Sequence, residues 1–438
     1  MITRKKAEKL GLKARERLGR NDLAEQAKRR FDPMDVLRSA CRDHLPELIP
    51  EKFRRMKANA FAFLRGAVEI MAADLGAGPN TGIEVQLCGD AHLKNFGYFA
   101  TPGSDIVLDV NDFDQTQRGP WEWDVKRMAT SIMVAGRLGR NSEPQCRAAT
   151  LGFLTRYCRA IHEFAEMPSI EVARYRVRRD KSDAAMRTAL EKAQRASPLG
   201  SLEKLTRPVK SGRMLVEIPE EMWHVPRPGK ARVLAALEEY RETLAPDKQI
   251  IFDRYTAVDV AFKIVGTGSV GTRDYVVLLF GRDKRDPLFL QVKQELPTPY
   301  RKFYPDASAP KHQGERVVRG QRAIQSQPDM LLGWCSIASQ QYLVRQVADH
   351  KAGLDPEQLS PNTLTTYADI CAELLAKAHA RTSEPAMLAA YIGETEKAAT
   401  ALLKFAEKYA DQTEADYEKF RKALKSGLEK KAVQSAGG

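Results

Sequence analysis

Apolar residues recur at intervals of three and four through the first 75 residues, which is the spacing of amphipathic helices. The pattern changes after residue 82, where two short β-branched runs, IEVQLCGD and IVLDVNDFD, lie on either side of a turn at TPGSD. Residues 83–114 are therefore predicted to form two strands that bracket a loop. Helical spacing returns over residues 124–166.

A second strand-rich region begins near Tyr255 and contains AFKIVGTGSVGTRDYVVLLF, PLFLQVKQ and QQYLVRQV. One helical piece, at about residues 314–327, interrupts it. After GLDPEQLSPN the pattern is helical almost to the end, and the final KAVQSAGG is predicted to be a frayed tail. The chain is therefore predicted to be an α+β protein, with a β-rich part set within a mostly helical chain.

With 438 residues and 43% hydrophobic composition, the chain is long enough for two lobes with cores of their own. The longest strongly apolar run is VVLLF, so no membrane span is expected. The basic first segment has no apolar region with a cleavage site, and a cytoplasmic protein is expected. Six cysteines without a CxxC pair predict reduced thiols and no structural metal.

The net charge of +13 is concentrated in two segments. Residues 1–57 and residues 174–213 each carry a net +8, which leaves the rest of the chain at −3. The favoured interpretation is that these segments are solvated helix faces, and the alternative is an acidic partner such as RNA, a lipid headgroup or a phosphorylated ligand. Aromatic residues are not interleaved with the basic runs, which argues against nucleic acid.

Gly266, Gly268 and Gly271 spell GxGxxG, a motif that several folds share. A dinucleotide-binding loop would open a helix, but here the chain continues as YVVLLF, a strand-like run. The glycines are therefore predicted to join two strands of a hairpin. Such a lid lets backbone N–H groups close over nucleotide phosphates, as in kinases.

The next strand, PLFLQVKQ, places Lys293 on the face opposite Leu288, Leu290 and Val292. Lys293 is predicted to reach the phosphates, the alternative being an ordinary exposed lysine. Glu315, on the following helix, is the candidate acid to hold this lysine, although Glu295 or solvent could serve instead.

The segment CGDAHLKNFG directly follows a predicted strand and carries Asp90 and Asn95, and the second strand ends in NDFDQ with Asp112. Phosphoryl transfer needs a carboxylate near the attacking hydroxyl, and an amide oxygen with a second carboxylate to hold magnesium. Asp90 is therefore predicted to be the base, and Asn95 and Asp112 the metal ligands.

Three neighbouring residues receive secondary roles. Asp114 is predicted to support or replace Asp112 at the metal, and Asp109 to be a turn or capping acid of its own strand. His92 is predicted to brace the loop by hydrogen bonding. The alternative for both loops is that Asp and Asn merely cap strands and turn the chain.

GDAHLKN and NDFDQ resemble the catalytic loop and metal-binding motif of the aminoglycoside and choline phosphotransferase branch of the protein-kinase-like superfamily. GPWEWDVKRMATS resembles the segment that follows in those enzymes, which implies that Asp124 braces the catalytic loop. Cys88 stands where those enzymes usually carry His, which affects only a structural hydrogen bond. Nearly the whole chain resembles a bacterial uncharacterised family, domain of unknown function 2252, on the motifs FAFLRG, CGDAHLKNFG, NDFDQT, WDVKR, GTGSVGTRDYVVLL, LQVKQ, GQRAIQ, YLVRQ and KAHAR.

The catalytic loop precedes the glycine loop, which reverses the order found in ordinary kinases. The resemblance therefore implies a kinase-like bilobal fold that is circularly permuted, with a small antiparallel β-rich lobe and a large helical lobe. The expected parts are a basic helical N-terminal extension (1–57), a large-lobe part with the catalytic and metal-binding motifs (58–245), the nucleotide-binding small lobe (246–350) and a helical C-terminal part of the large lobe (351–438). The helix TLTTYADICAELLAKAHAR is expected beside the catalytic loop.

These expectations imply a phosphotransferase that uses ATP and Mg²⁺ and acts on a small molecule or protein that no sequence feature identifies. One alternative is a protein AMP-transferase of the same fold. Another is a pseudokinase or scaffold that binds nucleotide without turnover and offers a basic surface to acidic partners. The acidic catalytic positions are all present, which argues against inactivity.

Overall fold

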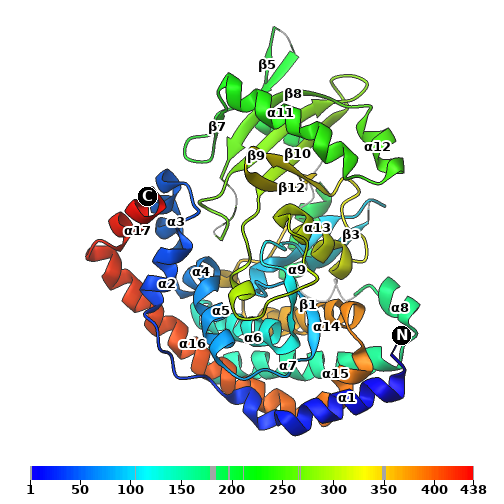
Figure 1. Ribbon diagram of the computed structural model, residues 1–438, viewed down its shortest axis with the longest axis vertical. Coiled ribbons are helices and arrows are strands. Elements are labelled where there is room, and N and C mark those ends of the chain that lie inside the picture. Colours follow the sequence, from blue (N-terminus) through cyan, green and yellow to red (C-terminus); the bar gives the residue numbers. More distant parts are fainter. Residues whose placement is uncertain are drawn as a thin grey trace.

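The computed structural model describes residues 2–103, 105–177, 184–195, 198–210, 212–264, 266, 268–347 and 352–437. Helices predominate, and the strands form small antiparallel sheets (Figure 1). The largest sheet lies at one end of the molecule and most of the helices at the other. In the part of the chain that the structure describes, no helix is both long and apolar enough to cross a membrane.

Six antiparallel strands form the largest sheet, in the order β11-β12-β10-β9-β8-β7. Their bounds are Met222–His224 (β7), Thr256–Lys263 (β8), Asp274–Phe280 (β9), Pro287–Gln294 (β10), Gly333–Ile337 (β11) and Gln340–Gln346 (β12). Helix α11 (Arg227–Glu242) shares a core with the sheet through Val233 and Tyr240, and α12 (Pro246–Phe252) follows. The sheet and its helix thus begin upstream of residue 246, the predicted start of the β-rich part. The predicted end, residue 350, lies outside the described residues.

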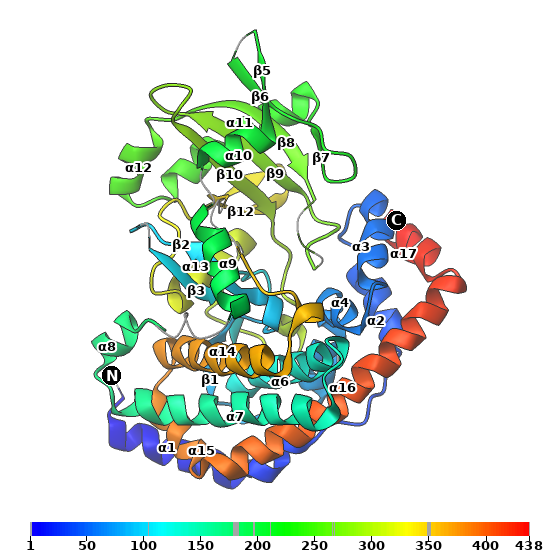
Figure 2. The same ribbon diagram turned by 180° about the vertical axis from the view of Figure 1, so that it is seen from behind.

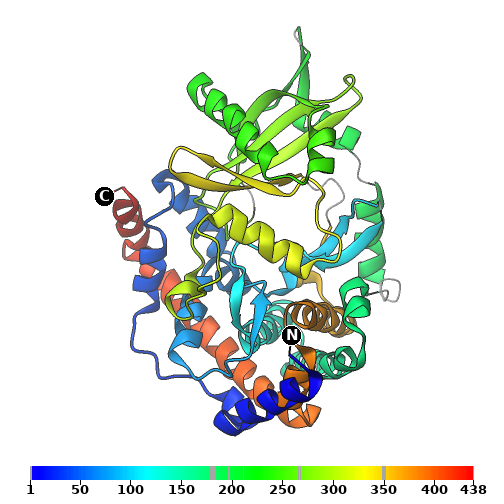
Figure 3. The same cartoon turned by 45° about the vertical axis from the view of Figure 1, so that its right-hand side comes forward.

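Helix α13 (Gln313–Ile324) corresponds to the predicted helical piece in the strand-rich region. It lies between the sheet and the helical part of the molecule (Figure 3). Its Arg316 side chain donates to the carbonyl oxygen of Thr116 over 2.6 Å. Gln325, directly after the helix, donates to the carbonyl oxygen of Val110 over 2.6 Å. Both bonds fasten the helix to the segment that carries Asp112 and Asp114.

Two pairs of short strands hold the polar loops. β1 (Glu84–Leu87) pairs with β4 (Gln117–Pro120), and β2 (Phe96–Ala100) pairs with β3 (Ile106–Val110). The sequence predicted β1 and β3, with the turn between β2 and β3 at TPGSD. It missed β2 and β4, because FGYFA and QRGP have no β-branched run and become strands through their partners.

Five helices form the body of the helical part. Their bounds are Trp121–Leu138 (α6), Glu143–Glu166 (α7), Pro361–Thr382 (α14), Pro385–Ile392 (α15) and Thr395–Lys425 (α16). α7 and α14 run side by side over most of their length (Figure 2). The helices predicted over residues 124–166 are α6 and α7. The break follows Arg140, whose φ is +58°, and α7 restarts with a capping box between Ser142 and Gln145.

The N-terminal helices pack onto the body and do not project from it. Their bounds are Arg4–Arg17 (α1), Pro33–Ala40 (α2), Ile49–Met56 (α3), Ala60–Gly66 (α4) and Val68–Ala77 (α5). The Phe53 and Phe63 rings lie 5.4 and 5.2 Å from that of Phe420 on α16. The C-terminal helix α17 (Leu428–Ala436) buries Leu428 and Ala432 in the same core. The prediction of a frayed tail is thus wrong as far as Ala436. Leu428 and Ala432, on successive turns of this mostly polar helix, are both apolar and buried.

The basic segment 174–213 forms helices and part of a hairpin, with residues 178–183, 196–197 and 211 lying outside the described residues. The elements here are Ser169–Arg174 (α8), Ala184–Arg195 (α9), Pro198–Leu205 (α10), Thr206–Val209 (β5) and Gly212–Leu215 (β6). α9 buries Met186 and Ala193 and exposes Arg187, Lys192 and Arg195, as expected of a solvated basic face. Short 3-10 turns lie at Arg20–Ala24, Pro46–Leu48, Leu93–Asn95, Pro299–Lys302 and Pro356–Gln358.

A buried ion pair joins β3 to α14. Lys377 and Asp109 are 268 residues apart in sequence, their Nζ and Oδ2 atoms lie 2.5 Å apart, and both side chains are buried. Asp109 also accepts a hydrogen bond from the Val110 N–H. The bond to Val110 fits the predicted turn or capping acid, and the second Asp109 oxygen binds a distant lysine, which the sequence did not predict.

Replacing Lys377 by methionine is expected to lower the free energy of unfolding by about 3–5 kcal/mol, because it leaves the Asp109 carboxylate buried without a cation. Urea unfolding at pH 7 measures the change. The second replacement Asp109→Asn should restore part of the loss. Lys397→Met is the matched control, since that lysine is exposed in an i,i+3 pair and should change stability by less than about 1 kcal/mol. An unchanged unfolding midpoint in Lys377→Met would contradict the pair.

Candidate active site

The loop that contains Asp90 leaves β1 through Gly89, whose φ of +86° lies in the left-handed region. A Cβ at this position would collide with the carbonyl oxygen of Gln115, so glycine is required. The Asp124 carboxylate on α6 accepts hydrogen bonds from the backbone N–H groups of Cys88 (2.8 Å) and Gly89 (3.0 Å). Asp124 therefore braces the loop, which is the role that the resemblance implied.

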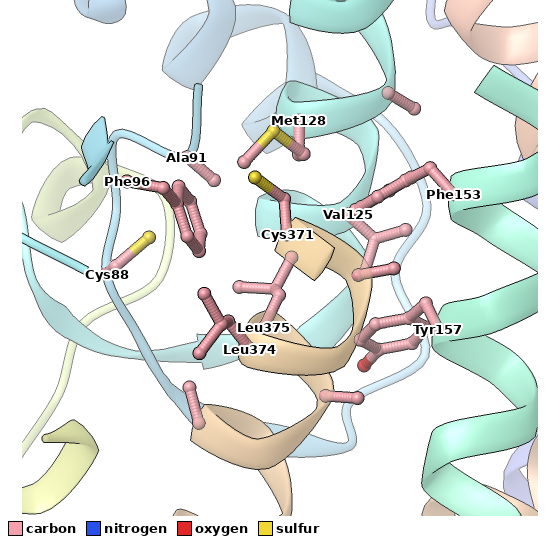
Figure 4. Close-up of a cluster of buried hydrophobic side chains, with 14 of the residues drawn as sticks. Cys88, Ala91, Phe96, Val125, Met128, Phe153, Tyr157, Cys371, Leu374 and Leu375 are labelled. Carbon is pink, nitrogen blue, oxygen red and sulfur yellow. The ribbon is translucent and has the colours of Figure 1, made fainter. Parts of the chain in front are cut away.

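Buried apolar side chains form a floor under this loop (Figure 4). The floor combines residues of the loop region with residues of α6 and α14, namely Cys88, Ala91, Phe96, Val125, Met128, Cys371, Leu374 and Leu375. Cys88 is thus a packing residue here, and all six cysteines of the chain are buried free thiols, as predicted. The Tyr367 hydroxyl on α14 also donates to the carbonyl oxygens of Leu93 (3.0 Å) and Phe96 (2.7 Å). The helix TLTTYADICAELLAKAHAR, expected beside the catalytic loop, is α14, and it does contact the loop.

Asp90 is paired with Arg127, a fully buried arginine of α6. Arg127 Nε donates to Asp90 Oδ1 over 2.6 Å, and His92 Nε2 lies 3.4 Å from Asp90 Oδ2. Burial alone would raise the pKa of Asp90, but Arg127 and His92 outweigh it and hold the pKa well below its usual range. The carboxylate is therefore ionised at neutral pH and able to accept a hydrogen bond from a hydroxyl group.

Asn95 connects the two polar loops. Its Nδ2 donates to the carbonyl oxygens of Asp90 (3.0 Å) and Asp112 (2.9 Å), and its Oδ1 accepts from the Asp112 N–H (2.7 Å). These three bonds join the Asp90 loop directly to the Asp112 segment. The Asp112 side chain remains 47% exposed, so it is accessible to a ligand.

Lys293 of β10 is brought to the same place from the six-stranded sheet. Its Nζ donates to Asp114 Oδ1 over 2.7 Å, although the two residues are 179 positions apart, and it lies 3.7 Å from Asp112 Oδ1. Burial would lower the pKa of Lys293, but Asp112 and Asp114 outweigh it and raise it. Burial and the charge of Asp112 raise the pKa of Asp114 to about 6. Lys293 is thus neither exposed nor far from the predicted metal-binding motif.

The structure does not bring Glu315 to Lys293, so that prediction is wrong. The Glu315 carboxylate pairs with Arg319, one turn further along α13. The next residue, Arg316, points inward instead and donates to the carbonyl oxygens of Asp114 and Leu296 (both 2.9 Å). Successive helical residues are about 100° apart around the axis, so Glu315 faces away when Arg316 faces the site. Asp114 takes the position expected for Glu315.

The glycines lie between β8 and β9, which pair antiparallel as the sequence predicted. Gly266 and Gly271 have φ values of +70° and +112°, which side chains would strain. The loop rests on the N-terminal segment. The Leu45 N–H donates to the carbonyl oxygen of Gly271 (2.7 Å), and Lys52 Nζ lies 3.5 Å from that of Gly268. Arg55 donates to the carbonyl oxygen of Gly266. Residues 1–57 therefore do more than form solvated helix faces, because some of them contact the glycine loop.

A pocket of about 590 Å³ borders Gly268 of this loop and Asp114. Its lining residues come mainly from α2, α5, the glycine loop and the chain that follows β10. Three acceptor oxygens on its lining residues are buried and have no hydrogen-bond partner, namely Glu69 Oε2, Gln115 Oε1 and Glu295 Oε1. Unsatisfied buried acceptors are costly, and these three belong to residues that border the pocket.

Residues 42–423 match a protein family described as an uncharacterized protein conserved in bacteria, DUF2252. The chain belongs to the DUF2252 family. No curated protein and no solved structure matches it.

In the DUF2252 protein, the polar groups around Asp112 and Asn95 provide only some of the ligands that a hard cation needs. Across the described ranges, no three His, Cys, Asp or Glu side chains are grouped to hold a metal ion. Asp112 offers an accessible carboxylate and Asn95 Oδ1 a neutral oxygen that already accepts one bond. Mg²⁺ commonly binds through one or two such oxygens plus substrate phosphates and waters. The residues therefore fit Mg²⁺ that arrives with a nucleotide.

Two groups of site residues in this DUF2252 protein were missed, although the sequence contained a signal for each. Arg127 and Ser131 follow the predicted Asp124 at i+3 and i+7 on a buried helix, and both contact the Asp90 loop. Such a polar stripe on an apolar helix indicates a site. Lys52 falls on the same face of α3 as Ile49, Phe53 and Met56, which predicts burial despite its charge.

Proposed function

We propose that this DUF2252 protein is a phosphotransferase that uses ATP and Mg²⁺, with a kinase-like bilobal fold whose motif order is circularly permuted. One observation carries the proposal. Lys293, on the strand that follows the glycine hairpin, lies within 3.7 Å of Asp112, and Asn95 links Asp112 to the Asp90 loop. Three motifs that are far apart in sequence thus converge, which chance turns and caps would not produce.

The order of strands supports the proposed fold. The glycine hairpin β8–β9, the lysine strand β10, helix α13 and the hairpin β11–β12 follow one another in the chain, and the sheet places β10 between β9 and β12. A kinase-like small lobe has a glycine hairpin, a lysine strand and a helix in this sequence. The Asp90 loop would follow this lobe in an ordinary kinase, whereas here it precedes the lobe in the chain.

Each residue then has a task in the transfer. The glycine loop and Lys293 hold the phosphates, and Asn95 and Asp112 hold Mg²⁺, which would neutralise charge on those phosphates. Asp90 accepts the hydrogen bond of the attacking hydroxyl and so orients it toward phosphorus. Arg127 keeps Asp90 ionised and makes it a weak base. That suffices, because a loose phosphoryl transition state needs orientation more than early proton removal.

The 590 Å³ pocket beside Gly268 and Asp114 is proposed to bind a small-molecule ligand next to the Asp90 loop, which does not itself line the pocket. Its volume lies in the range of small-molecule sites. Its lining includes the polar side chains of Glu69, Gln115 and Glu295, which suit hydroxyl or amino groups. A small molecule with several such donors therefore fits the pocket better than an apolar one.

Labelled ATP tests the proposed function. The purified protein is incubated with a bacterial extract and either γ- or α-³²P-labelled ATP, and small molecules and proteins are analysed separately. We expect the γ label to move to an acceptor, and Asp90→Asn to slow the transfer by about 10²- to 10⁴-fold. Movement of the α label would instead support AMP transfer. ATP binding without movement of either label would contradict the phosphotransferase and support a nucleotide-binding protein without turnover.

A further inference from the structure

Arg65 lies in the last turn of α4, next to the glycine loop. A Cβ built on Gly268 would lie 3.5 Å from the Arg65 carbonyl oxygen. The preceding residue, Leu64, accepts a hydrogen bond from Arg127 over 2.9 Å through its own carbonyl oxygen. Arg127 in turn holds Asp90. The backbone at Arg65 is thus placed between the Asp90 loop and the glycine loop.

The guanidinium of Arg65 has no partner to balance it. Its Nε is buried and makes no hydrogen bond, and none of the described residues forms an ion pair or a hydrogen bond with the group. Burial lowers the pKa of Arg65, while the charges of Asp90 and Asp112 act to raise it. Asp90 is bound to Arg127, and Asp112 Oδ1 lies 3.7 Å from Lys293 Nζ.

Arg65 is half-buried, and its Nε has lost water without gaining a hydrogen bond, which is costly. A phosphoryl group between Asp90 and Asp112 would add negative charge beside two carboxylates. A cation on the same spot would offset that repulsion, and the planar fork of an arginine matches phosphate oxygens. The guanidinium donors of Arg65, which make no hydrogen bond or ion pair with the described residues, are available for such an anion.

We propose that Arg65 binds the terminal phosphoryl group of the nucleotide, at a subsite between the Asp90 loop, Asp112 and Gly268. This inference rests on the proposed function, since it assumes that ATP occupies the site. It assigns a role to α4, whose sequence AFAFLRG contains the motif FAFLRG of the resemblance.

Calorimetric titrations with two nucleotides test the subsite. The β,γ-imido analogue of ATP carries the terminal group and ADP lacks it, and both are titrated with Mg²⁺ into the full chain. We expect Arg65→Ala to weaken binding of the analogue by about tenfold or more and binding of ADP by less than about twofold, since one charge-assisted contact is lost. Arg54→Ala, a 67% exposed arginine on α3, is the matched control and should change neither.

Arg65→Lys serves in case the alanine variant does not fold, because it keeps the charge near the two acids but loses the planar fork. Its loss of analogue affinity should be smaller than for alanine, with ADP again unchanged. Equal losses for both nucleotides, or no loss for either, would overturn the Arg65 subsite while leaving the proposed function intact. If the unaltered protein binds neither nucleotide, the proposed function itself fails.

Discussion

Lys293→Met is expected to weaken ATP binding by about 10- to 100-fold, which corresponds to the loss of one charge-assisted contact with the phosphates. It should also lower the free energy of unfolding by about 3–5 kcal/mol, because Asp114 is left buried without its cation. Calorimetry with ATP and Mg²⁺ measures the first effect and urea unfolding the second.

A second replacement separates these two effects. Lys293→Met combined with Asp114→Asn removes the unpaired carboxylate, so part of the stability should return while nucleotide affinity stays low. Lys284→Met is the control, since that lysine is exposed on the turn between β9 and β10. If ATP affinity recovered together with stability, Lys293 would be a structural residue and not a phosphate ligand.

Asp90→Asn is expected to slow phosphoryl transfer by about 10²- to 10⁴-fold, the usual contribution of a positioned acid or base. ATP affinity should change little, because Asp90 faces the hydroxyl and not the nucleotide. Single-turnover transfer of the γ label measures the rate, and calorimetry the affinity. Stability should fall as well, since Arg127 is left buried without its carboxylate.

Asp105→Asn is the matched control for Asp90→Asn, because that carboxylate is exposed next to the turn between β2 and β3. Its transfer rate should equal that of the unaltered protein. A cellular phenotype that survives Asp90→Asn but disappears with Lys293→Met would contradict a catalytic role and indicate that nucleotide binding alone is the function.

Local sequence patterns predicted the elements that carry the site. β-branched runs on both sides of Gly266 and Gly271 predicted a hairpin, and alternation along PLFLQVKQ separated Lys293 from the apolar face. The loops with Asp90 and Asp112 were located because each follows a strand-like run. These features depend on neighbours in the chain, which the sequence contains directly.

The partners of the charged residues could not be predicted in the same way. Lys293 pairs with Asp114 and not with Glu315, and Lys377 pairs with Asp109 from the other end of the chain. Each choice depends on which segments cross in space, and acids elsewhere in the chain match equally well by sequence. The burial of Lys52 could not be inferred from composition, because the net charge of residues 1–57 does not show which single lysine lies on an apolar helix face.

A crystal structure of the protein with the β,γ-imido analogue of ATP and Mg²⁺ is the most direct test of the proposed phosphotransferase site. We expect the phosphates to lie under Gly266, Gly268 and Gly271, in contact with Lys293, and a magnesium ion to bind Asn95 and Asp112. A nucleotide bound elsewhere, or one bound here with its phosphates pointing away from Lys293 and Asp112, would contradict it.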